Sequence, residues 1–253
     1  MGKIKVGLLG FGRTGKIVAN EIITSPAVSL QWVIRQHRDE ENYASHLLGY
    51  DFEQGTIWGK DDIAGEFFRE NPVDIIIDFS SSQAVHEYKA AASLGIPIVS
   101  AISKYAPADL AMLESYAAKT AVLYSPNITL GVNMLMVVAH VLQNIAPHAD
   151  IEIVEEHFRE KKEVSGTAKK IAKVLSADPA NIHSIRVGKI IGKHDIIFGL
   201  ANQTIRLSHE SVDRAAFGQG AIFAAKFLVE QAPGLYSMEQ IVSGMFKKNI
   251  PVY

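Results

Sequence analysis

The chain contains no cysteine, and this absence removes several classes of chemistry. It can form no disulfide, has no thiolate nucleophile and cannot build a cysteine-ligated zinc site. The formal net charge is only -2, so the sequence lacks the excess of basic residues that nucleic-acid-binding proteins carry. Apolar runs are short, and none approaches the roughly 18 residues that a membrane-spanning helix requires. We therefore expect a cytoplasmic protein without a nucleic-acid or membrane partner.

Strands and helices alternate through the first half of the 253-residue chain. Short apolar runs predict strands at 4–9, 30–34, 56–58, 73–79, 96–101 and 121–124. Helical spacing of apolar residues predicts helices at 16–23, 83–94 and 109–119. This order is typical of a Rossmann-like, doubly wound α/β domain with right-handed crossovers. The strand at 56–58 is weak, and the rest of the segment 37–72 has no assignment.

After residue 126 the pattern changes to clustered strands. The predicted helices are at 132–145, 167–175, 218–231 and 238–246, and the predicted strands are at 151–158, 182–191, 194–200 and 203–209. Few helices separate the last three strands. The second part of the chain therefore reads as an α+β domain with an open mixed sheet.

Glycines gather directly after the first predicted strand, in the sequence GLLGFGRTG. They contain the pattern G-x-G-x-x-G between a strand and a helix. Such glycines allow a tight turn and a close approach of the backbone to a pyrophosphate, whose charge lies at the amino end of the helix. The pattern predicts a dinucleotide site, and a plain tight turn is the alternative. The expected cofactor-binding residues of the turn are Gly7, Gly10, Phe11, Gly12, Arg13, Thr14 and Gly15.

The residue about 20 positions past such a turn usually selects the coenzyme. A carboxylate there binds a ribose hydroxyl, whereas an arginine suits a 2'-phosphate. In this chain the position is Arg35, followed by His37 and Arg38. We therefore expect NADPH to be preferred and NADH to be the alternative coenzyme. The competing interpretation is that these are solvated charges of a loop.

A histidine and a lysine stand four positions apart, at His157 and Lys161, within the segment EHFREKKEVSGT. Strand alternation before them places on one face Ile151, Ile153, Glu155 and His157. His157 then lies at the end of a strand, where α/β proteins place reacting groups. Together with Arg159 and Lys162, Lys161 forms a cationic patch that suits carboxylates. We expect a substrate site here, although a structural role is the alternative for a lone histidine.

The same segment ends in Ser165, Gly166 and Thr167, which open a predicted helix. Ser165 or Thr167 can serve as the N-cap, and the exposed backbone N–H groups can bind a carboxylate. Capping alone is the alternative interpretation. We expect structural roles for His140, His183, His194 and His209, and we expect no metal requirement.

The order of four motifs resembles the 4-hydroxy-tetrahydrodipicolinate reductase family of the lysine pathway, also called dihydrodipicolinate reductase. The motifs are GxxGxG at the start, DFS from Asp78 to Ser80, PNxTxGVN from Pro126 to Asn133, and EHxxxK followed by SGTA. The similarity continues through IHSIRVGKIIGKHDIIFG and DRAAFGQGAIFAAKFL, so it covers nearly the whole chain.

The resemblance implies that NAD(P)H passes hydride to C4 of a cyclic, imine-derived dicarboxylate, with loss of water from the hydroxylated form. It implies that His157 and Lys161 lie at the substrate, with Lys161 as proton donor, because hydride addition builds negative charge that an acid can quench. The substrate-binding residues that would hold a carboxylate are Ser165, Gly166 and Thr167. The cofactor-binding residues beyond the glycine turn would be Arg35, Phe79, Ser80, Ala101, Ser103, Ser125 and Asn127.

Members of this family are typically tetramers joined through the sheets of the second domain. The resemblance therefore implies a dinucleotide-binding domain formed by residues 1–126 and 215–253. Residues 127–214 would form the substrate-binding and tetramerisation domain of a homotetramer.

Three departures from the family pattern keep other functions open. The family's GTTG motif is replaced after Ser100 by Ala101, Ile102, Ser103 and Lys104; a second histidine is replaced by Phe158; and the loop before SGT is shorter and lacks a proline. One alternative is a related NAD(P)H reductase of another dicarboxylate or imine. The other is a non-catalytic nucleotide-binding paralogue, against which the retained His157 and Lys161 argue.

Overall fold

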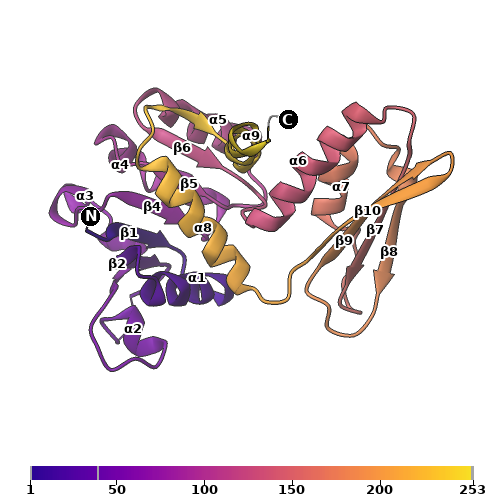
Figure 1. Ribbon diagram of the computed structural model, residues 1–253. Helices are drawn as coiled ribbons and strands as arrows, with labels where there is room; N and C mark the ends of the chain where they lie inside the picture. Colours follow the sequence, from indigo (N-terminus) through magenta and orange to yellow (C-terminus); the bar gives the residue numbers. More distant parts are fainter. Residues whose placement is uncertain (1, 39, 252–253) are drawn as a thin grey trace. The chain divides into compact units, whose positions relative to one another are not determined.

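The computed structural model describes residues 2–38 and 40–251. The chain forms two compact units, shown in Figure 1. Unit 1 comprises Met1–Thr129 and Phe217–Ile241, and unit 2 comprises Leu130–Ala216 and Val242–Tyr253. The assignment of cofactor binding to the first part of the chain and substrate binding to the second stays a prediction.

Unit 1 is built on a parallel sheet with the strand order β11-β6-β5-β4-β1-β2-β3. Its strands are β1 (Ile4–Leu9), β2 (Val28–Arg35), β3 (Thr56–Gly59), β4 (Ile75–Asp78), β5 (Ile98–Ser100), β6 (Ala121–Tyr124) and β11 (Gly234–Tyr236). The strand order reverses direction beside β1, which pairs with both β2 and β4. Ligands of doubly wound sheets bind at the carboxyl ends of the strands at such a reversal. The prediction of a Rossmann-like sheet is confirmed, and β11 is an additional edge strand.

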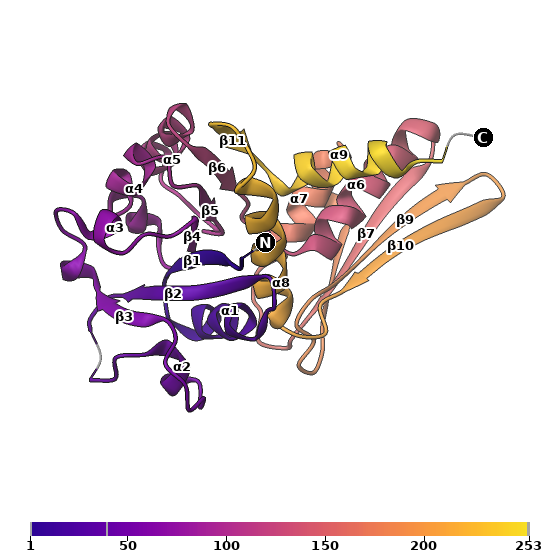
Figure 2. The same cartoon turned by 60° about the vertical axis from the view of Figure 1, so that its left-hand side comes forward.

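Helices cover both faces of this sheet. They are α1 (Arg13–Thr24), α2 (Ala44–Leu47), α3 (Phe67–Glu70), α4 (Lys89–Ser93), α5 (Pro107–Ser115) and α8 (Ala215–Leu228). Figures 1 and 2 show α1 and α8 side by side, and a Cβ added at Gly218 of α8 would lie 3.3 Å from Val18 Cα of α1. On the other face, α3, α4 and α5 share a buried cluster with alternate residues of the strands. Because both faces are covered, β4 is buried along its whole length.

The helix predicted at 83–94 is interrupted. A 3-10 helix at Ser82–His86 precedes α4, and the chain between them is not helical. Both Val85 and Tyr88 are fully buried in the cluster below. Val85 lies within the 3-10 helix and Tyr88 in the turn after it, and the side chains of both belong to this cluster.

Unit 2 contains a sheet with the strand order β10-β9-β7-β8. Its elements are α6 (Leu130–Ile145), β7 (Asp150–His157), α7 (Gly166–Val174), β8 (Ile182–Arg186), β9 (Lys193–Leu200) and β10 (Gln203–Glu210), and α9 (Met238–Asn249) ends the described chain. β7 is parallel to β8 and antiparallel to β9. The predicted open mixed sheet is therefore confirmed. None of the described helices, α6 included, has the length and apolar character needed to cross a membrane.

One face of the second sheet packs under α6 and α7 (Figure 2). Apolar residues of both helices surround Ile153, Ile196 and Phe198 of the strands. The predicted alternation of β7 is confirmed, since Ile153, Glu155 and His157 are buried and the residues between them are less so. The buried face of this strand thus changes from apolar to polar at its carboxyl end.

Candidate functional site

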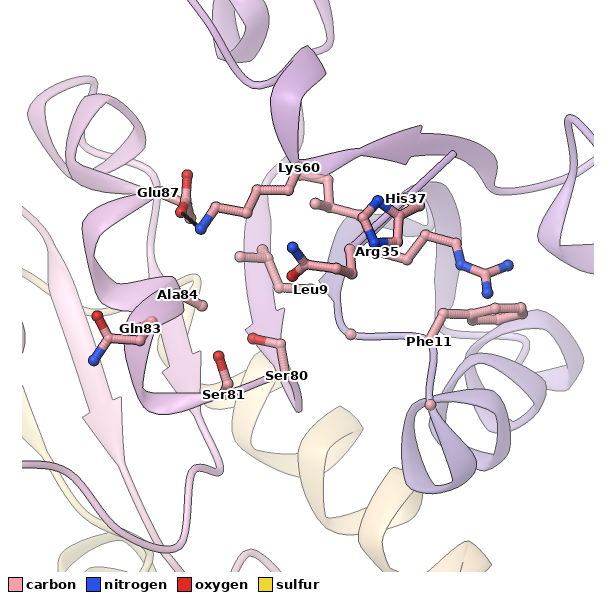
Figure 3. Close-up of a pocket in the computed structure, with 14 residues that line it drawn as sticks. Leu9, Phe11, Arg35, His37, Lys60, Ser80, Ser81, Gln83, Ala84 and Glu87 are labelled. Atoms are coloured by element: carbon pink, nitrogen blue, oxygen red, sulfur yellow. Dashed lines mark ion pairs between the residues drawn. The ribbon is translucent and has the colours of Figure 1, made fainter. Parts of the chain in front are cut away.

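The glycine-rich turn after β1 borders a pocket of about 380 Å³ in unit 1 (Figure 3). Gly10 has a φ of +94°, and a Cβ there would lie 2.7 Å from the backbone of Phe79. At Gly15 an added Cβ would lie 2.1 Å from the carbonyl oxygen of Gly10. Only glycine fits these two positions without a shift of the backbone. The turn therefore holds β1, the start of α1 and the end of β4 close together.

The amino end of α1 is open to an anion. Gly12 is the N-cap, and neither a capping side chain nor an acidic residue occupies the first turn. A Cβ added at Gly12 would meet nothing within 4 Å, so a ligand can approach the backbone closely. Because the first N–H groups of a helix have no partner within the helix, this geometry fits the diphosphate of a dinucleotide.

Two cationic side chains, Arg35 and Lys60, also line this pocket. Figure 3 shows Arg35 at the end of β2, His37 after β2 and Lys60 after β3 around the pocket. Lys60 Nζ lies 2.8 Å from Glu87 Oε1. Among the described lining residues Glu87 is the only carboxylate. Lys60 was not identified from the sequence, because it follows the weakly predicted strand.

A second pocket of about 390 Å³ lies beside the turn in unit 1, and Ser80 lines both pockets. It brings together five of the predicted cofactor residues, namely Thr14, Phe79, Ser80, Ala101 and Ser103. The departure residue Lys104 also lines it. Four other predicted cofactor residues have positions that shape the backbone. Gly7 lies against the Trp32 ring, and Arg13 is the first residue of α1. Ser125 Oγ donates a hydrogen bond to the carbonyl of Asn127.

The loop that replaces the GTTG motif is tied to a buried polar network. Asp78 is fully buried, and its Oδ1 accepts from Ser80 N at 2.9 Å while Oδ2 accepts from Tyr88 OH at 3.3 Å. Tyr88 contacts Tyr105, which is hydrogen-bonded to Ser100 Oγ at 2.8 Å. Burial raises the pKa of Asp78 to about 6, although the hydrogen bonds from Ser80 and Tyr88 act to lower it. Tyr105 thus anchors the carboxyl end of the 101–104 loop.

In unit 2 the centre of the candidate site is Glu155, whose side chain is 0% exposed. Its carboxylate accepts from Arg186 at 2.6 and 3.0 Å, from Ser184 Oγ at 2.6 Å and from Ser165 N at 3.2 Å, and it also bonds His157 Nδ1. Burial opposes ionisation, but the hydrogen bonds from Arg186 and Ser184 outweigh it and lower the pKa of Glu155 to about 2. The carboxylate is therefore ionised and can only accept hydrogen bonds.

His157 is 7% exposed at the end of β7. Burial lowers its pKa, and the bond to Glu155 opposes this change. Since the carboxylate has no proton to donate, Nδ1 must carry the hydrogen of the neutral ring. The other ring nitrogen, Nε2, faces Gly192, where an added Cβ would lie 3.0 Å away.

The first turn of α7 is connected to a second buried histidine. Ser165 is the N-cap, and its Oγ accepts from Ala168 N and is hydrogen-bonded to His194 Nε2 at 2.9 Å. His194 was expected to have only a structural role, but it contacts the predicted site, with its ring centroid 5.3 Å from that of His157. Burial lowers the pKa of His194 to about 4. A Cβ at Gly166 would meet nothing within 4 Å, so the helix start is open there.

Lys161 lies on the loop between β7 and α7. Its backbone N–H donates to Phe158 O at 3.1 Å, and its carbonyl accepts from Arg186 Nε at 2.8 Å. The structure thus places His157, Lys161 and Ser165, all predicted, around one ion pair, in which Glu155 is buried and Arg186 is 19% exposed. That pair was not predicted as part of the site: Glu155 was placed only on the same strand face as His157, and Arg186 gave no separate signal.

No cluster of three or more His, Asp or Glu side chains able to hold a metal ion occurs among residues 2–38 and 40–251. The carboxylate oxygens of Glu155 accept hydrogen bonds from protein groups rather than facing other carboxylates or a group of metal ligands.

Proteins of one family match both halves of the sequence. The family models "Dihydrodipicolinate reductase, N-terminus" and "Dihydrodipicolinate reductase, C-terminus" match residues 4–128 and 131–242. A 4-hydroxy-tetrahydrodipicolinate reductase of Caldanaerobacter subterraneus subsp. tengcongensis is 35% identical, over 67% of this chain and 76% of that protein. One of the same name from Wolbachia pipientis wMel is 31% identical, over 95% of this chain and 100% of that protein.

Solved structures share the fold. The dipicolinate-bound dihydrodipicolinate reductase from Paenisporosarcina sp. TG-14 has a TM-score of 0.76 at 20% identity, covering 94% of this chain and 99% of that chain. The C. glutamicum DAP dehydrogenase in complex with DAP has a TM-score of 0.62 at 11% identity, covering 99% and 100% of the two chains. Together with the motifs on β1, β4, β7 and α7, the sequence matches establish that the chain belongs to the dihydrodipicolinate reductase family.

Proposed function

We propose that this protein catalyses the NAD(P)H-dependent reduction of 4-hydroxy-tetrahydrodipicolinate to tetrahydrodipicolinate in lysine and diaminopimelate biosynthesis. Its family membership and the names of its relatives support this activity. The observation that carries the proposal is that one chain has both a pocket fitted to a dinucleotide and a second site where His157, Ser165 and the Lys161 loop meet around Glu155 and Arg186.

The reduced nicotinamide, when bound, supplies the hydride. The open start of α1 would bind the diphosphate, and Gly10 permits its close approach. Arg35 and Lys60 would bind a 2'-phosphate, which supports a preference for NADPH. Phe79, Ser80 and the 101–104 loop would surround the reacting end of the coenzyme.

The substrate carries two carboxylates, and unit 2 offers two kinds of group to bind them. The start of α7 provides backbone N–H groups and a helix dipole, while Lys161 provides a positive charge. Lys161 would also donate the proton that quenches the charge built up during reduction. Neutral His157 would present Nε2 to the site as a hydrogen-bond acceptor or a proton carrier.

We further propose a cytoplasmic homotetramer joined through the sheets of unit 2. Partly exposed apolar residues on and after β8 support an interface there, namely Ile185 and Val187. Size-exclusion chromatography with light scattering tests the tetramer, and a monomeric mass would exclude it.

The activity is tested by following NADPH oxidation with substrate made in place from pyruvate and aspartate semialdehyde by the preceding synthase. Wild type should turn over, and His157→Ala and Lys161→Ala should each lose most of the rate. Tight NADPH binding without turnover would contradict the proposed substrate.

A second candidate is a reductase of another dicarboxylate or imine. The observation that favours it is Lys104, which adds a charged side chain to the pocket beside Phe79. Profiling cyclic and open-chain imines with wild type and Lys104→Ala distinguishes the two candidates, because only the second predicts a better substrate than the lysine-pathway compound.

A further inference from the structure

We propose that Glu155 and Arg186 act as a positioning pair for the substrate site of unit 2. The pair holds three elements in one arrangement: the ring of His157, the loop that carries Lys161, and the first turn of α7. Neither member needs to touch the substrate. This inference deepens the proposed function and rests on it for the identity of the substrate.

The carboxylate of Glu155 joins the end of β7 to the start of α7. One oxygen, Oε2, bonds His157 Nδ1, and the other, Oε1, accepts from Ser165 N at 3.2 Å. Each bond therefore fixes one of the groups proposed to meet the substrate. Without an acceptor at Nδ1, a neutral histidine can place its hydrogen on either ring nitrogen, and Nε2 would no longer be a defined acceptor.

The guanidinium of Arg186 joins the same carboxylate to the Lys161 loop. Nη1 and Nη2 donate to Glu155, while Nε donates to Lys161 O at 2.8 Å and Nη2 to Glu163 O at 3.0 Å. The remaining hydrogen of Nη1 donates to Ile185 O at 2.9 Å. All five donors of an arginine are thus used. A lysine has three donors on a compact head and cannot reproduce this planar arrangement.

The arrangement compensates for a feature of this sequence. The loop from Phe158 to Val164 contains no proline that would restrict its backbone. Arg186 instead fixes two of its carbonyl groups, those of Lys161 and Glu163. A loop ordered before the substrate arrives spends less binding energy on ordering. A displacement of about 1 Å in a reacting group can lower the rate on the order of 100-fold.

Charge balance keeps the pair in place. The other ionisable groups that face it are His157 of β7, His194 of β9 and Lys161 of the loop. Both histidines have a lowered pKa because they are buried, so neither supplies a second cation to Glu155. Arg186 is therefore the principal counter-ion of the buried carboxylate, and removing one partner leaves the other charge uncompensated.

The decisive variant is Arg186→Lys, which keeps the positive charge and removes the planar guanidinium with its five donors. We expect kcat/KM for the dicarboxylate substrate to fall on the order of 10- to 100-fold, with a raised KM. The dissociation constant of NADPH should stay within about twofold, because the coenzyme pocket lies in unit 1. Glu155→Gln should show the same loss together with a changed pH profile of kcat/KM.

The chain supplies a matched control. Glu152 lies on the same strand as Glu155 and pairs with His183 of β8 at 2.7 Å, but both side chains are exposed. Glu152→Gln removes a carboxylate of the same strand and should leave kcat/KM unchanged. Thermal unfolding of every variant shows whether a loss of rate reflects loss of the folded state.

Two readouts separate this proposal from the proposed function. In the free wild type, nitrogen NMR of the imidazole should show His157 as the Nδ1–H tautomer, and Glu155→Gln should mix the tautomers. Binding of dipicolinate, a planar dicarboxylate, should weaken on the order of tenfold in Arg186→Lys. If the wild type shows this tautomer but does not turn over the substrate, the proposed activity is refuted and the proposed positioning role of Glu155 and Arg186 stands. Folded Arg186→Lys with wild-type kcat/KM and dipicolinate affinity would overturn the pair itself.

Discussion

The imidazole of His194 is hydrogen-bonded to the N-cap hydroxyl of Ser165 at 2.9 Å, and both residues are buried. This bond is part of a polar row that crosses the second sheet. The residues in register along it are Ser184, Glu155, His194 and His209. The adjacent row of the same strands is apolar, at the buried Ile153 and Ile196 and the partly buried Leu207. One sheet therefore builds both the core of unit 2 and its candidate site.

The buried histidine predicts a loss of stability in acid. Burial lowers the pKa of His194 from 6.5 to about 4, so the unfolded chain takes up a proton at a higher pH than the folded one. The stabilisation from the neutral ring is complete above about pH 6.5 and is lost as the pH falls toward 4, by up to about 3 kcal/mol. Denaturant unfolding of wild type and His194→Gln at pH 7 and pH 4.5 measures this. An equal pH dependence in both proteins would count against it.

A single methyl group near His157 should impair the substrate site. Gly192 lacks a positive φ, and a Cβ there would lie 3.0 Å from His157 Nε2. Gly192→Ala should therefore displace the ring and lower kcat/KM on the order of 10-fold, with little effect on NADPH binding. Gly199→Ala on β9, the strand that begins directly after Gly192, is the control, since its Cβ would make an ordinary contact of 3.7 Å with Asp150. Equal activity of the two variants would show that His157 is not so confined.

The coenzyme preference can be tested at Lys60. If its ammonium binds the 2'-phosphate, Lys60→Gln should raise KM for NADPH roughly 10-fold, because a charge-assisted hydrogen bond contributes about 1.5 to 3 kcal/mol. NADH lacks this phosphate and serves as the control within the same protein. The preference itself is contradicted if wild type uses NADH with a KM equal to or below that for NADPH.

The local patterns of the sequence predicted much of this fold. Gly10 and Gly15 were recognisable because a tight turn between a strand and a helix requires glycine. The alternation that ends in His157 predicted which residues of β7 share a face, because strand side chains alternate between faces. Both signals lie within a few residues of chain, where backbone geometry restricts the choice of residue.

The partners of those residues could not be read from local pattern. Arg186 is 31 positions from Glu155, and only the pairing of β7 with β8 brings them together. Lys60 reaches the pocket beside the glycine-rich turn from the end of a short strand, and His194 meets Ser165 through the pairing of β9. A buried carboxylate does require a partner. The position of Glu155 on the buried face was therefore a signal that a counter-ion existed, without identifying it.

The buried Asp78 predicts a substitution that stabilises the protein. Burial raises its pKa from 3.8 to about 6, so the folded state holds the proton more tightly than the unfolded chain. That stabilisation is complete below about pH 3.8 and is lost as the pH rises through 6. Above pH 6 the free energy of unfolding is therefore lower than in acid by up to about 3 kcal/mol, because the buried carboxylate is charged. Asp78→Asn keeps an acceptor for Ser80 and removes the charge.

The variant Asp78→Asn should therefore raise the free energy of unfolding at pH 8, with a smaller gain at pH 4.5, as measured by urea denaturation. Asp74→Asn is the matched control, because Asp74 lies just before the same strand and is exposed, and an asparagine keeps an acceptor for the backbone N–H of Lys5. Its effect should stay within about 0.5 kcal/mol at both pH values. If Asp78→Asn destabilises the protein equally at pH 8 and pH 4.5, the hydrogen bonds that Asp78 accepts from Ser80 and Tyr88 matter more than the burial of its charge, and the ionised carboxylate is then part of what anchors the 101–104 loop.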